Sequence, residues 1–291
     1  MEWIILKDTV KVAAVQLWIK SELKKGREGN IKRAITLMEE AVALEVDFIC
    51  LPELFIGAGF SEPIPGPTTE VLSDFARDNK VYLTGGLFEK AGDIQYNSTP
   101  VFDRNGKIIF NHRKINLFPW EATFRKSTPG NVLKVLDLDF GKAGVILCQD
   151  LAIPETPRIL ALKGAEILFV PSRMPAQFLA FWRRVCRVRA LENNVFICTA
   201  GMAKQKWIGS LIVAPKFEND VIVECGPDQQ VITAELDLGW LRETRKDSPL
   251  YHVTTWKEIA EVLPKMKTQS FILDRRPELY LEEFQKIDGK K

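Results

Sequence analysis

Two short runs of almost wholly apolar residues constrain the fold more than any other feature of this chain. They are Asp47-Phe-Ile-Cys-Leu51 and Ala143-Gly-Val-Ile-Leu-Cys148. Strands that are this uniformly apolar are typical of α/β proteins, in which both faces of the sheet are covered. Polar residues follow each run at once, as Pro52-Glu53 and Gln149-Asp150. We therefore expect both strands to end at a sheet edge, where α/β proteins assemble their sites.

The remaining pattern alternates strands with amphipathic helices. Strands are expected at residues 10–17, 81–88, 96–103, 107–110, 132–138, 166–170 and 195–199, and helices after an N-cap at Asn30 and over 68–79, 154–164 and 177–193. Asn105-Gly106 between apolar runs predicts a hairpin. Since no linker or change in composition divides the chain, we expect one α/β domain over 1–291, with a core at about 10–240 and a charged C-terminal tail at about 241–291.

Charge and cysteine content exclude several classes of protein. The net charge is only +2, which gives little support to a nucleic-acid partner or a membrane surface. No apolar run approaches the roughly 18 residues of a membrane span, and Lys7-Asp8 interrupts the N-terminal run, so a cytoplasmic location is expected. The five cysteines form no CxxC pair, which fits neither a disulfide framework nor a zinc site.

Cys148 is the candidate nucleophile because it ends an apolar strand a few residues before a helix, a geometry that exposes a side chain above a sheet. A single cysteine is more often a small buried hydrophobe, and that role is expected for Cys50, Cys186, Cys198 and Cys225. The nucleophile needs a base, and two alternatives stay open at this point. His112 is one of only two histidines, with His252, and Glu53 follows the other apolar strand.

Lys114 is a candidate cation for the same site, because apolar residues follow it directly and suggest a partly buried ammonium. An ammonium beside a carboxylate and a thiol is expected to favour the ionised carboxylate and the thiolate. The sequence has no P-loop, dinucleotide-binding glycine pattern or HExxH motif, so neither a metal nor an organic cofactor is expected.

Taken in order, these segments resemble the nitrilase superfamily of carbon–nitrogen hydrolases. The resemblance covers about residues 10–240 and 274–280. The matching blocks are Leu51-Pro-Glu-Leu-Phe55 with Gly59-Phe60, Arg113-Lys-Ile-Asn-Leu-Phe118 with Glu121 and Pro129-Gly130, and Gly144-Val-Ile-Leu-Cys-Gln-Asp150 with Pro154-Glu155, Arg158 and residues 161–165. Shorter matches are Tyr96-Asn97-Ser98, Arg189-Ala-Leu-Glu-Asn193, Gly209-Ser210, Glu235-Leu-Asp237 and Asp274-Arg-Arg-Pro-Glu-Leu-Tyr280.

The resemblance implies a four-layer α-β-β-α sandwich and a catalytic triad of Glu53, Lys114 and Cys148. It places Glu121 beside the triad, and the backbone N–H of Gln149 would join Lys114 as an oxyanion donor. Members of the family commonly dimerise, so a homo-oligomer is expected, with the tail around residues 275–280 packed at or near a subunit interface.

The substrate expected from these residues is a small amide. True nitrilases usually have Trp-Glu after the cysteine, where this chain has Gln149-Asp150, and many members have histidine where this chain has Asn116. Alternatives are a nitrilase, a carbamoyl-amide hydrolase, a glutamine-dependent ammonia donor, or a scaffold protein without turnover. Arg173 could pair with a substrate carboxylate and select monoamides of dicarboxylic acids. Other residues next to the motifs could line a pocket, although aromatic residues more often pack in the core: Phe55, Phe60, Phe118, Trp120 and Met174.

Overall fold

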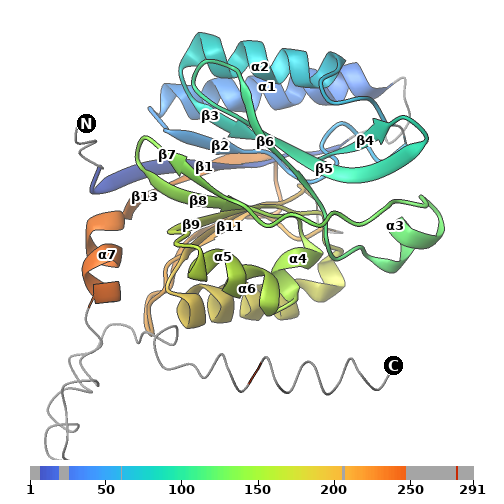
Figure 1. The fold of residues 1–291 in the computed structure, drawn as a ribbon. Coiled ribbons are helices and arrows are strands. Elements are labelled where there is room, and N and C mark those ends of the chain that lie inside the picture. The colour runs from blue at the N-terminus through green and yellow to red at the C-terminus, as the bar shows by residue number, and fades with distance from the viewer. Residues whose placement is uncertain (1–6, 20–25, 60, 205–206, 247–279, 281–291) are drawn as a thin grey trace, which may run out of the picture.

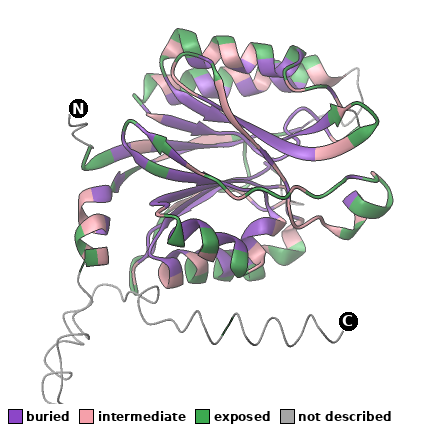
Figure 2. Cartoon of the chain, viewed as in Figure 1, coloured by how far each residue is buried: buried purple, intermediate pink, exposed green. Residues whose placement is uncertain are grey.

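Two β-sheets lie face to face between two layers of helices, which is the expected four-layer arrangement (Figure 1). The computed structural model describes residues 7–19, 26–59, 61–204, 207–246 and 280. The terminal motif at 274–279, Phe60 and His252 lie outside this part of the chain. In this arrangement the strands lie in the middle of the molecule, where most of their residues are buried (Figure 2).

The first sheet has seven strands in the order β13-β1-β2-β3-β5-β4, with β6 paired to β5. Its strands are β1 Thr9–Gln16, β2 Phe48–Cys50, β3 Tyr82–Thr84, β4 Leu87–Ala91, β5 Ile94–Phe102, β6 Ile108–Arg113 and β13 Gln230–Asp237. Strands β1, β2 and β3 run parallel, and the flanking strands are antiparallel. The predicted hairpin is confirmed because β5 and β6 pair antiparallel on either side of Gly106, whose φ is +79°.

The second sheet has six strands in the order β12-β11-β10-β9-β8-β7. Its strands are β7 Val135–Leu138, β8 Gly141–Val145, β9 Ile167–Pro171, β10 Phe196–Ala200, β11 Leu211–Val213 and β12 Val221–Glu224. Here too the central strands β8, β9 and β10 are parallel and the outer ones antiparallel. Both apolar runs of the sequence therefore lie in the parallel centre of a sheet.

Helices cover the outer face of each sheet (Figure 1). They are α1 Arg27–Ala43 and α2 Pro67–Asn79 over the first sheet, and α5 Glu155–Leu162 and α6 Leu179–Asn193 over the second. Shorter helices are α3 Pro119–Thr123, α4 Gln149–Ala152, a 3₁₀ turn at Ala176–Phe178 and the C-terminal α7 Leu238–Lys246. Between the sheets, the ring of Phe48 on β2 stacks on that of Phe169 on β9 with centroids 3.6 Å apart, joining the two halves of the core.

Two local expectations were wrong, and both differences come from packing. Asn30 is not an N-cap: it lies buried within α1, where its side-chain amide donates to Ile56 O at 3.1 Å. The strand expected at 81–88 is split into β3 and β4 at Gly85-Gly86. A Cβ added to Gly86 would lie 2.8 Å from the Cα of Glu53, so this break lets the turn that carries Glu53 pack closely.

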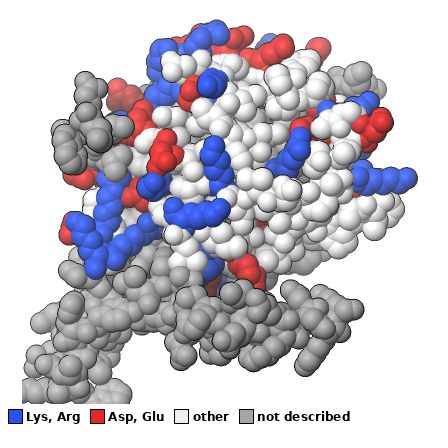
Figure 3. Space-filling view, in the orientation of Figure 1, with Lys and Arg blue, Asp and Glu red and all other residues white. Residues whose placement is uncertain are grey.

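Acidic and basic side chains are interspersed over the face seen in Figure 3, as the small net charge suggests. Within the described residues, no helix is both long and apolar enough to cross a membrane.

Candidate active site

Cys148 sits in the turn between β8 and α4, and its backbone is unusual. Its φ is +41° and its ψ is −100°, a conformation that residues with a side chain rarely adopt. The turn is held by hydrogen bonds from Cys148 N to Pro171 O at 3.0 Å and from Leu151 N to Cys148 O at 3.0 Å. The sequence predicted this order of strand, turn and helix. It places the buried Cys148 thiol at the edge of the second sheet where the parallel strands end.

Glu53 reaches the same place from the first sheet, in the turn that follows β2. Its carboxylate is buried, and Oε1 accepts hydrogen bonds from Lys114 Nζ and Asn97 Nδ2, both at 2.8 Å. The charge of the Glu53 carboxylate also acts on the nearby Cys148 thiol, whose pKa it raises. Glu53 therefore lies between the nucleophile and the ammonium, whereas His112 is paired elsewhere, so Glu53 is the base placed to exchange a proton with the thiol.

Lys114 follows β6 and is almost completely buried, with 2% of its side chain exposed. Its backbone is fixed by Lys114 N donating to Asn97 O and by Gly130 N donating to Lys114 O, each at 2.8 Å. The ammonium donates to Glu53 Oε1 at 2.8 Å and to Glu121 Oε2 at 2.7 Å. An ammonium has three N–H donors, so these two bonds leave one for a reacting group.

Glu121 lies in α3, where Oε2 also accepts Phe118 N at 2.8 Å and so fixes the start of that helix. The Asn97 amide donates to both Glu53 and Glu121 and joins the two carboxylates. Although Tyr96-Asn97-Ser98 was noted as a familial match, Asn97 was not expected in the site. Its burial on a strand that passes between the two glutamates was not visible in the sequence.

Burial and the neighbouring charges together set the pKa values of this site. Desolvation raises the pKa of the Glu53 carboxyl despite the opposing charge of Lys114, and Glu121 raises it further. Desolvation also raises the pKa of the Cys148 thiol well above its usual value, with the charge of Glu53 adding to the effect. Burial acts to lower the pKa of Lys114, but the charge of Glu53 and its neighbours outweighs it, so the pKa is raised. The charge of Lys114 lowers the pKa of the thiol, as expected, but desolvation and the charge of Glu53 outweigh it.

A cavity of about 440 Å³ opens onto these groups. Apart from Glu53, Lys114, Glu121 and Cys148, its lining is mostly apolar or aromatic: Leu54, Ala58, Gly59, Phe118, Trp120, Met174, Pro175 and Trp207, with Arg173. The guanidinium of Arg173 lies over the Trp207 ring, 4.9 Å from its centroid. The backbone N–H of Arg173 acts to lower the pKa of the Cys148 thiol, against the larger effect of burial.

The remaining candidates from the sequence divide between the cavity and the core. Phe118, Trp120, Met174 and Arg173 line the cavity as considered, whereas Phe55 is fully buried in the core between α1 and the first sheet. Gln149 is the first residue of α4 and is not among the lining residues. Trp207 was missed, because it belongs to a long connection without a recognisable pattern.

His112 does not pair with Cys148. Its Nε2 lies 2.8 Å from Asp150 Oδ2, and both side chains are completely buried. In the described part of the chain, no group of three or more His, Cys, Asp or Glu side chains is arranged to hold a metal ion. The other cysteines of the sequence, Cys50, Cys186, Cys198 and Cys225, do not line the cavity.

Comparison with known proteins shows the family of this chain. The family model described as carbon-nitrogen hydrolase matches residues 11–246. Omega-amidase NIT2-A of Xenopus laevis is 34% identical over 247 residues, which cover 77% of this chain and 88% of that protein. A nitrilase of Pyrococcus abyssi is 38% identical over 233 residues, covering 74% and 86%. Among solved structures, Saccharomyces cerevisiae Nit3, a member of branch 10 of the nitrilase superfamily, superposes with a TM-score of 0.75 at 27% identity, covering 88% of this chain and 98% of Nit3.

Proposed function

Because this chain belongs to the carbon–nitrogen hydrolase family, whose members hydrolyse carbon–nitrogen bonds other than peptide bonds, we propose that it hydrolyses a small amide through a thioester on Cys148. The products are a carboxylic acid and ammonia. The observation that carries the proposal is that the buried Glu53, Lys114 and Cys148 line one cavity, with the Lys114 ammonium bonded to the Glu53 carboxylate at 2.8 Å.

In the first half of the reaction, Glu53 takes the thiol proton as the Cys148 sulfur attacks the amide carbon. Burial and the charge of Glu53 raise the pKa of the thiol, so a base is needed to take its proton before or during the attack. The developing oxyanion is stabilised by the remaining N–H of Lys114 and by the backbone N–H of Gln149. Glu53 then returns the proton to the departing nitrogen, ammonia leaves, and a thioester remains.

In the second half, Glu53 takes a proton from a water molecule, which attacks the thioester carbon. The same donors hold the second oxyanion. When the tetrahedral intermediate collapses, the carbon–sulfur bond breaks and Glu53 protonates the leaving sulfur. The carboxylic acid is released, and both the thiol and the Glu53 carboxylate return to their starting states. Glu121 and Asn97 keep Glu53 and Lys114 in place throughout.

For the acyl group, we propose an amide whose far end carries a carboxylate. Arg173 is the cation in the cavity lining apart from Lys114, and a guanidinium pairs well with a carboxylate. The guanidinium also lies over the Trp207 ring, with Cζ 4.9 Å from the ring centroid. Several relatives, including the Xenopus laevis protein, are named omega-amidases, which agrees with an amide at the opposite end from a carboxylate. Arg173→Met should therefore raise KM for a dicarboxylic monoamide far more than for the neutral amide of equal length.

Nitrile hydrolysis is the second candidate because the Pyrococcus abyssi relative is named a nitrilase. An amide gives an oxyanion in its first step, whereas a nitrile gives a thioimidate nitrogen, and the donors here are arranged for an oxyanion. For matched acyl groups, we expect the amide to have at least about tenfold higher kcat/KM, or about 1.4 kcal/mol. Ammonia release from such pairs, with carbamoyl compounds in the same panel, decides between the candidates.

The direct test is Cys148→Ala, which removes the nucleophile with little change in volume. Turnover should be lost while circular dichroism and the thermal midpoint stay close to the parent values. Mass spectrometry of the parent protein during turnover should find an acyl adduct on the peptide containing Cys148. Cys186→Ala, a buried cysteine away from the cavity, is the matched control and should retain activity. An adduct on another cysteine, or no ammonia from any amide, nitrile or carbamoyl compound, would exclude the proposal, and the second result would favour a scaffold.

A further inference from the structure

The mechanism above leaves one buried ionisable pair beside the nucleophile without a role. The pair consists of Asp150, two residues after Cys148, and His112 on β6. Both side chains are fully buried, and His112 Nε2 lies 2.8 Å from Asp150 Oδ2. A buried carboxylate is costly unless its oxygens are hydrogen-bonded, so the partners of Asp150 indicate what it does.

Further donors to this carboxylate come from the two segments that carry the reacting groups. They are the backbone N–H groups of Leu147 (3.2 Å), Ile115 (3.2 Å) and Asn116 (2.7 Å), and the side-chain amide of Asn116 (3.0 Å). Leu147 directly precedes Cys148 in the turn between β8 and α4, here called the nucleophile turn. Ile115 and Asn116 directly follow Lys114, at the end of the first sheet. One side chain thus connects the segment of the nucleophile to the segment of the ammonium.

Both segments need this support. The backbone at Cys148 has φ +41°, and such a conformation persists only where surrounding contacts enforce it. Asp150 contributes to this turn through its own N–H, which donates to Leu147 O at 2.8 Å, as well as through its carboxylate. On the other side, the backbone of Lys114 is held by Asn97 and Gly130, and Asp150 fixes the residues that follow.

The protonation of the pair agrees with a purely accepting carboxylate. Although burial acts to raise the pKa of Asp150, hydrogen bonds from His112 and the Asn116 backbone and the charge of Lys114 lower it below its usual value. Asp150 is therefore ionised at neutral pH and can only accept hydrogen bonds. It follows that His112 Nε2 carries the proton of the shared hydrogen bond and donates it to Oδ2.

We propose that Asp150, oriented by His112, is a positioning residue that fixes the nucleophile turn relative to the Lys114 segment. The inference rests on the proposed roles of Cys148 and Lys114. In this role, the Asp150–His112 pair fixes the distance between the Cys148 thiol and the Lys114 ammonium. Stabilisation of the oxyanion depends on that distance. A displacement of about 1 Å at a reacting group can cost about 10²-fold in rate. Since neither side chain lines the cavity, substrate binding is left to other residues.

The first experiment separates positioning from charge by leaving Asp150 intact. His112→Gln keeps an N–H donor toward Oδ2, whereas His112→Phe keeps the ring volume and removes the donor. We expect His112→Gln to stay within about threefold of the parent kcat, and His112→Phe to lose about tenfold or more, with KM changed less than about threefold in both. Equal kcat values for the two variants, or a loss confined to KM, would overturn the proposal.

The second experiment uses Asp150→Asn, with Glu166→Gln as a matched control. Glu166 is also a buried carboxylate that accepts a backbone N–H and an arginine, but it lies away from the cavity. Asp150→Asn should lose about 10²-fold in kcat with little change in KM, while Glu166→Gln should lower the thermal midpoint and leave kcat unchanged. The proposal is wrong if Asp150→Asn keeps kcat within threefold of the parent, or if Glu166→Gln loses as much kcat as Asp150→Asn. If Asp150→Asn does not fold, the comparison of the two His112 variants decides.

These outcomes are distinguishable from failure of the proposed function. If Cys148→Ala retained turnover, the function itself would be wrong, whatever the His112 and Asp150 variants do. If Cys148→Ala is inactive and His112→Gln and His112→Phe behave alike, the thioester mechanism stands and only the positioning role is lost.

Discussion

Glu53 illustrates how packing changes the chemistry of a single side chain. Its Oε1 accepts hydrogen bonds from Lys114 and Asn97, and its charge raises the pKa of the Cys148 thiol in the same cavity. Desolvation raises the pKa of Glu53, which brings its proton affinity closer to that of the groups with which it exchanges protons. A surface glutamate would lack both the fixed direction and the raised pKa.

We predict that Glu53→Gln is nearly inactive. Glutamine keeps the size and an oxygen that accepts from Lys114, but it cannot take a proton, and general-base catalysis is typically worth about 10²- to 10⁴-fold. Steady-state ammonia release measures the loss. Glu62→Gln is a suitable control, because Glu62 is a buried glutamate paired with Arg27 that does not line the cavity. Retention of more than about a tenth of the parent kcat by Glu53→Gln would remove Glu53 from this role.

Lys114→Arg should fail although it keeps the charge. The ammonium sits between the carboxylates of Glu53 and Glu121 in a space with 2% of the side chain exposed. A planar guanidinium is larger and directs its donors differently, so it cannot keep both contacts and still reach an oxyanion. We expect a loss of about 10²-fold or more in kcat, comparable to removal of one oxyanion donor. Activity near the parent level would show that the position needs only a positive charge.

The pH profile of kcat/KM should report Glu53. The base must be ionised, and desolvation raises its pKa, with Glu121 adding to the rise, so activity should increase as pH rises through a value above that of an ordinary glutamate. Glu121→Gln removes the neighbouring negative charge, which lowers the pKa of Glu53. The acidic limb should therefore move to lower pH in this variant, even if the maximum rate falls. An unchanged limb, or a shift to higher pH, would contradict this assignment.

At the scale of elements, the sequence predicted most strands and helices because their apolar periodicity matches their burial. The parallel strands β2 and β8 and the β5–β6 hairpin were predicted from their apolar runs and from Asn105-Gly106. Asn30 was misplaced because a distant contact with Ile56 O holds it inside α1. Asn97 and Asp150 were not predicted as site residues, and His112 was considered only as a base for Cys148. Their roles depend on contacts between segments far apart in the chain.

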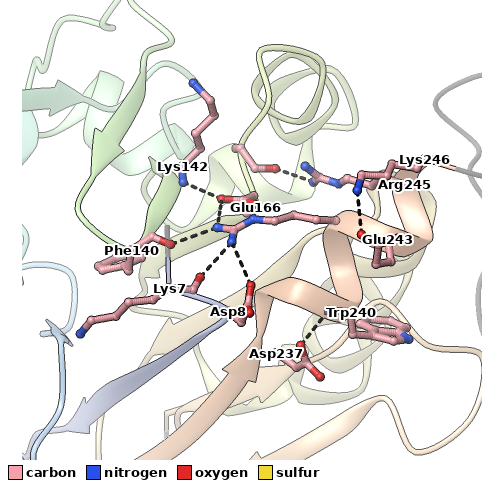
Figure 4. Close-up of polar contacts among 12 residues, drawn as sticks. Lys7, Asp8, Phe140, Lys142, Glu166, Asp237, Trp240, Glu243, Arg245 and Lys246 are labelled. Carbon is pink, nitrogen blue, oxygen red and sulfur yellow. Dashed lines mark hydrogen bonds and ion pairs between the residues drawn. The ribbon is translucent and has the colours of Figure 1, made fainter. Parts of the chain in front are cut away.

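Helix α7, which contributes no residue to the cavity lining, is also held by contacts between distant parts of the chain (Figure 4). Arg242 Nε donates to Glu166 Oε1 at 2.6 Å, and its other nitrogens donate to the carbonyls of Phe140 and Lys7 at 3.0 and 2.9 Å. Arg245, from the same helix, donates to the carbonyls of Ala165 and Asn194, and burial lowers its pKa to about 10. These arginines attach α7 to the start of β8 and β9.

We predict that Arg242→Leu lowers the free energy of unfolding by about 3 kcal/mol, because it leaves the buried carboxylate of Glu166 without its partner. Activity at 25 °C should be unchanged, since α7 contributes nothing to the cavity lining. Urea denaturation measures the stability. Glu243→Ala, in the same helix, removes an exposed ion pair with Lys246 and should cost less than about 1 kcal/mol. If the two substitutions lowered the free energy of unfolding equally, the Arg242–Glu166 contact would stabilise the protein no more than an exposed ion pair does.

Over the whole molecule, charged side chains are spread out, whereas several exposed apolar side chains lie together on one helical layer. Charges of both signs are spread over the visible face (Figure 3). By contrast, several large apolar side chains are exposed on the outer helices of the second sheet: Ile159, Leu162, Phe178, Phe181 and Val188. Phe178, Phe181 and Val188 recur at helical spacing, so they share one side of α6 and its preceding turn. Clusters of this kind mark interaction surfaces more often than isolated apolar residues do.

We predict a homo-oligomer that uses this outer face, as the family resemblance suggests. Phe181 is 48% exposed and Val188 50% exposed, and both are on α6, so burying them against a second copy would remove apolar surface from water. Light scattering should give a multiple of the 33.1 kDa chain mass at micromolar concentration. Phe181→Glu with Val188→Lys should reduce it toward the monomer mass, whereas Leu44→Glu, at the exposed end of α1 on the opposite layer, should not. A monomeric parent protein would contradict the prediction, and dissociation by Leu44→Glu alone would place the interface on the first sheet's helices.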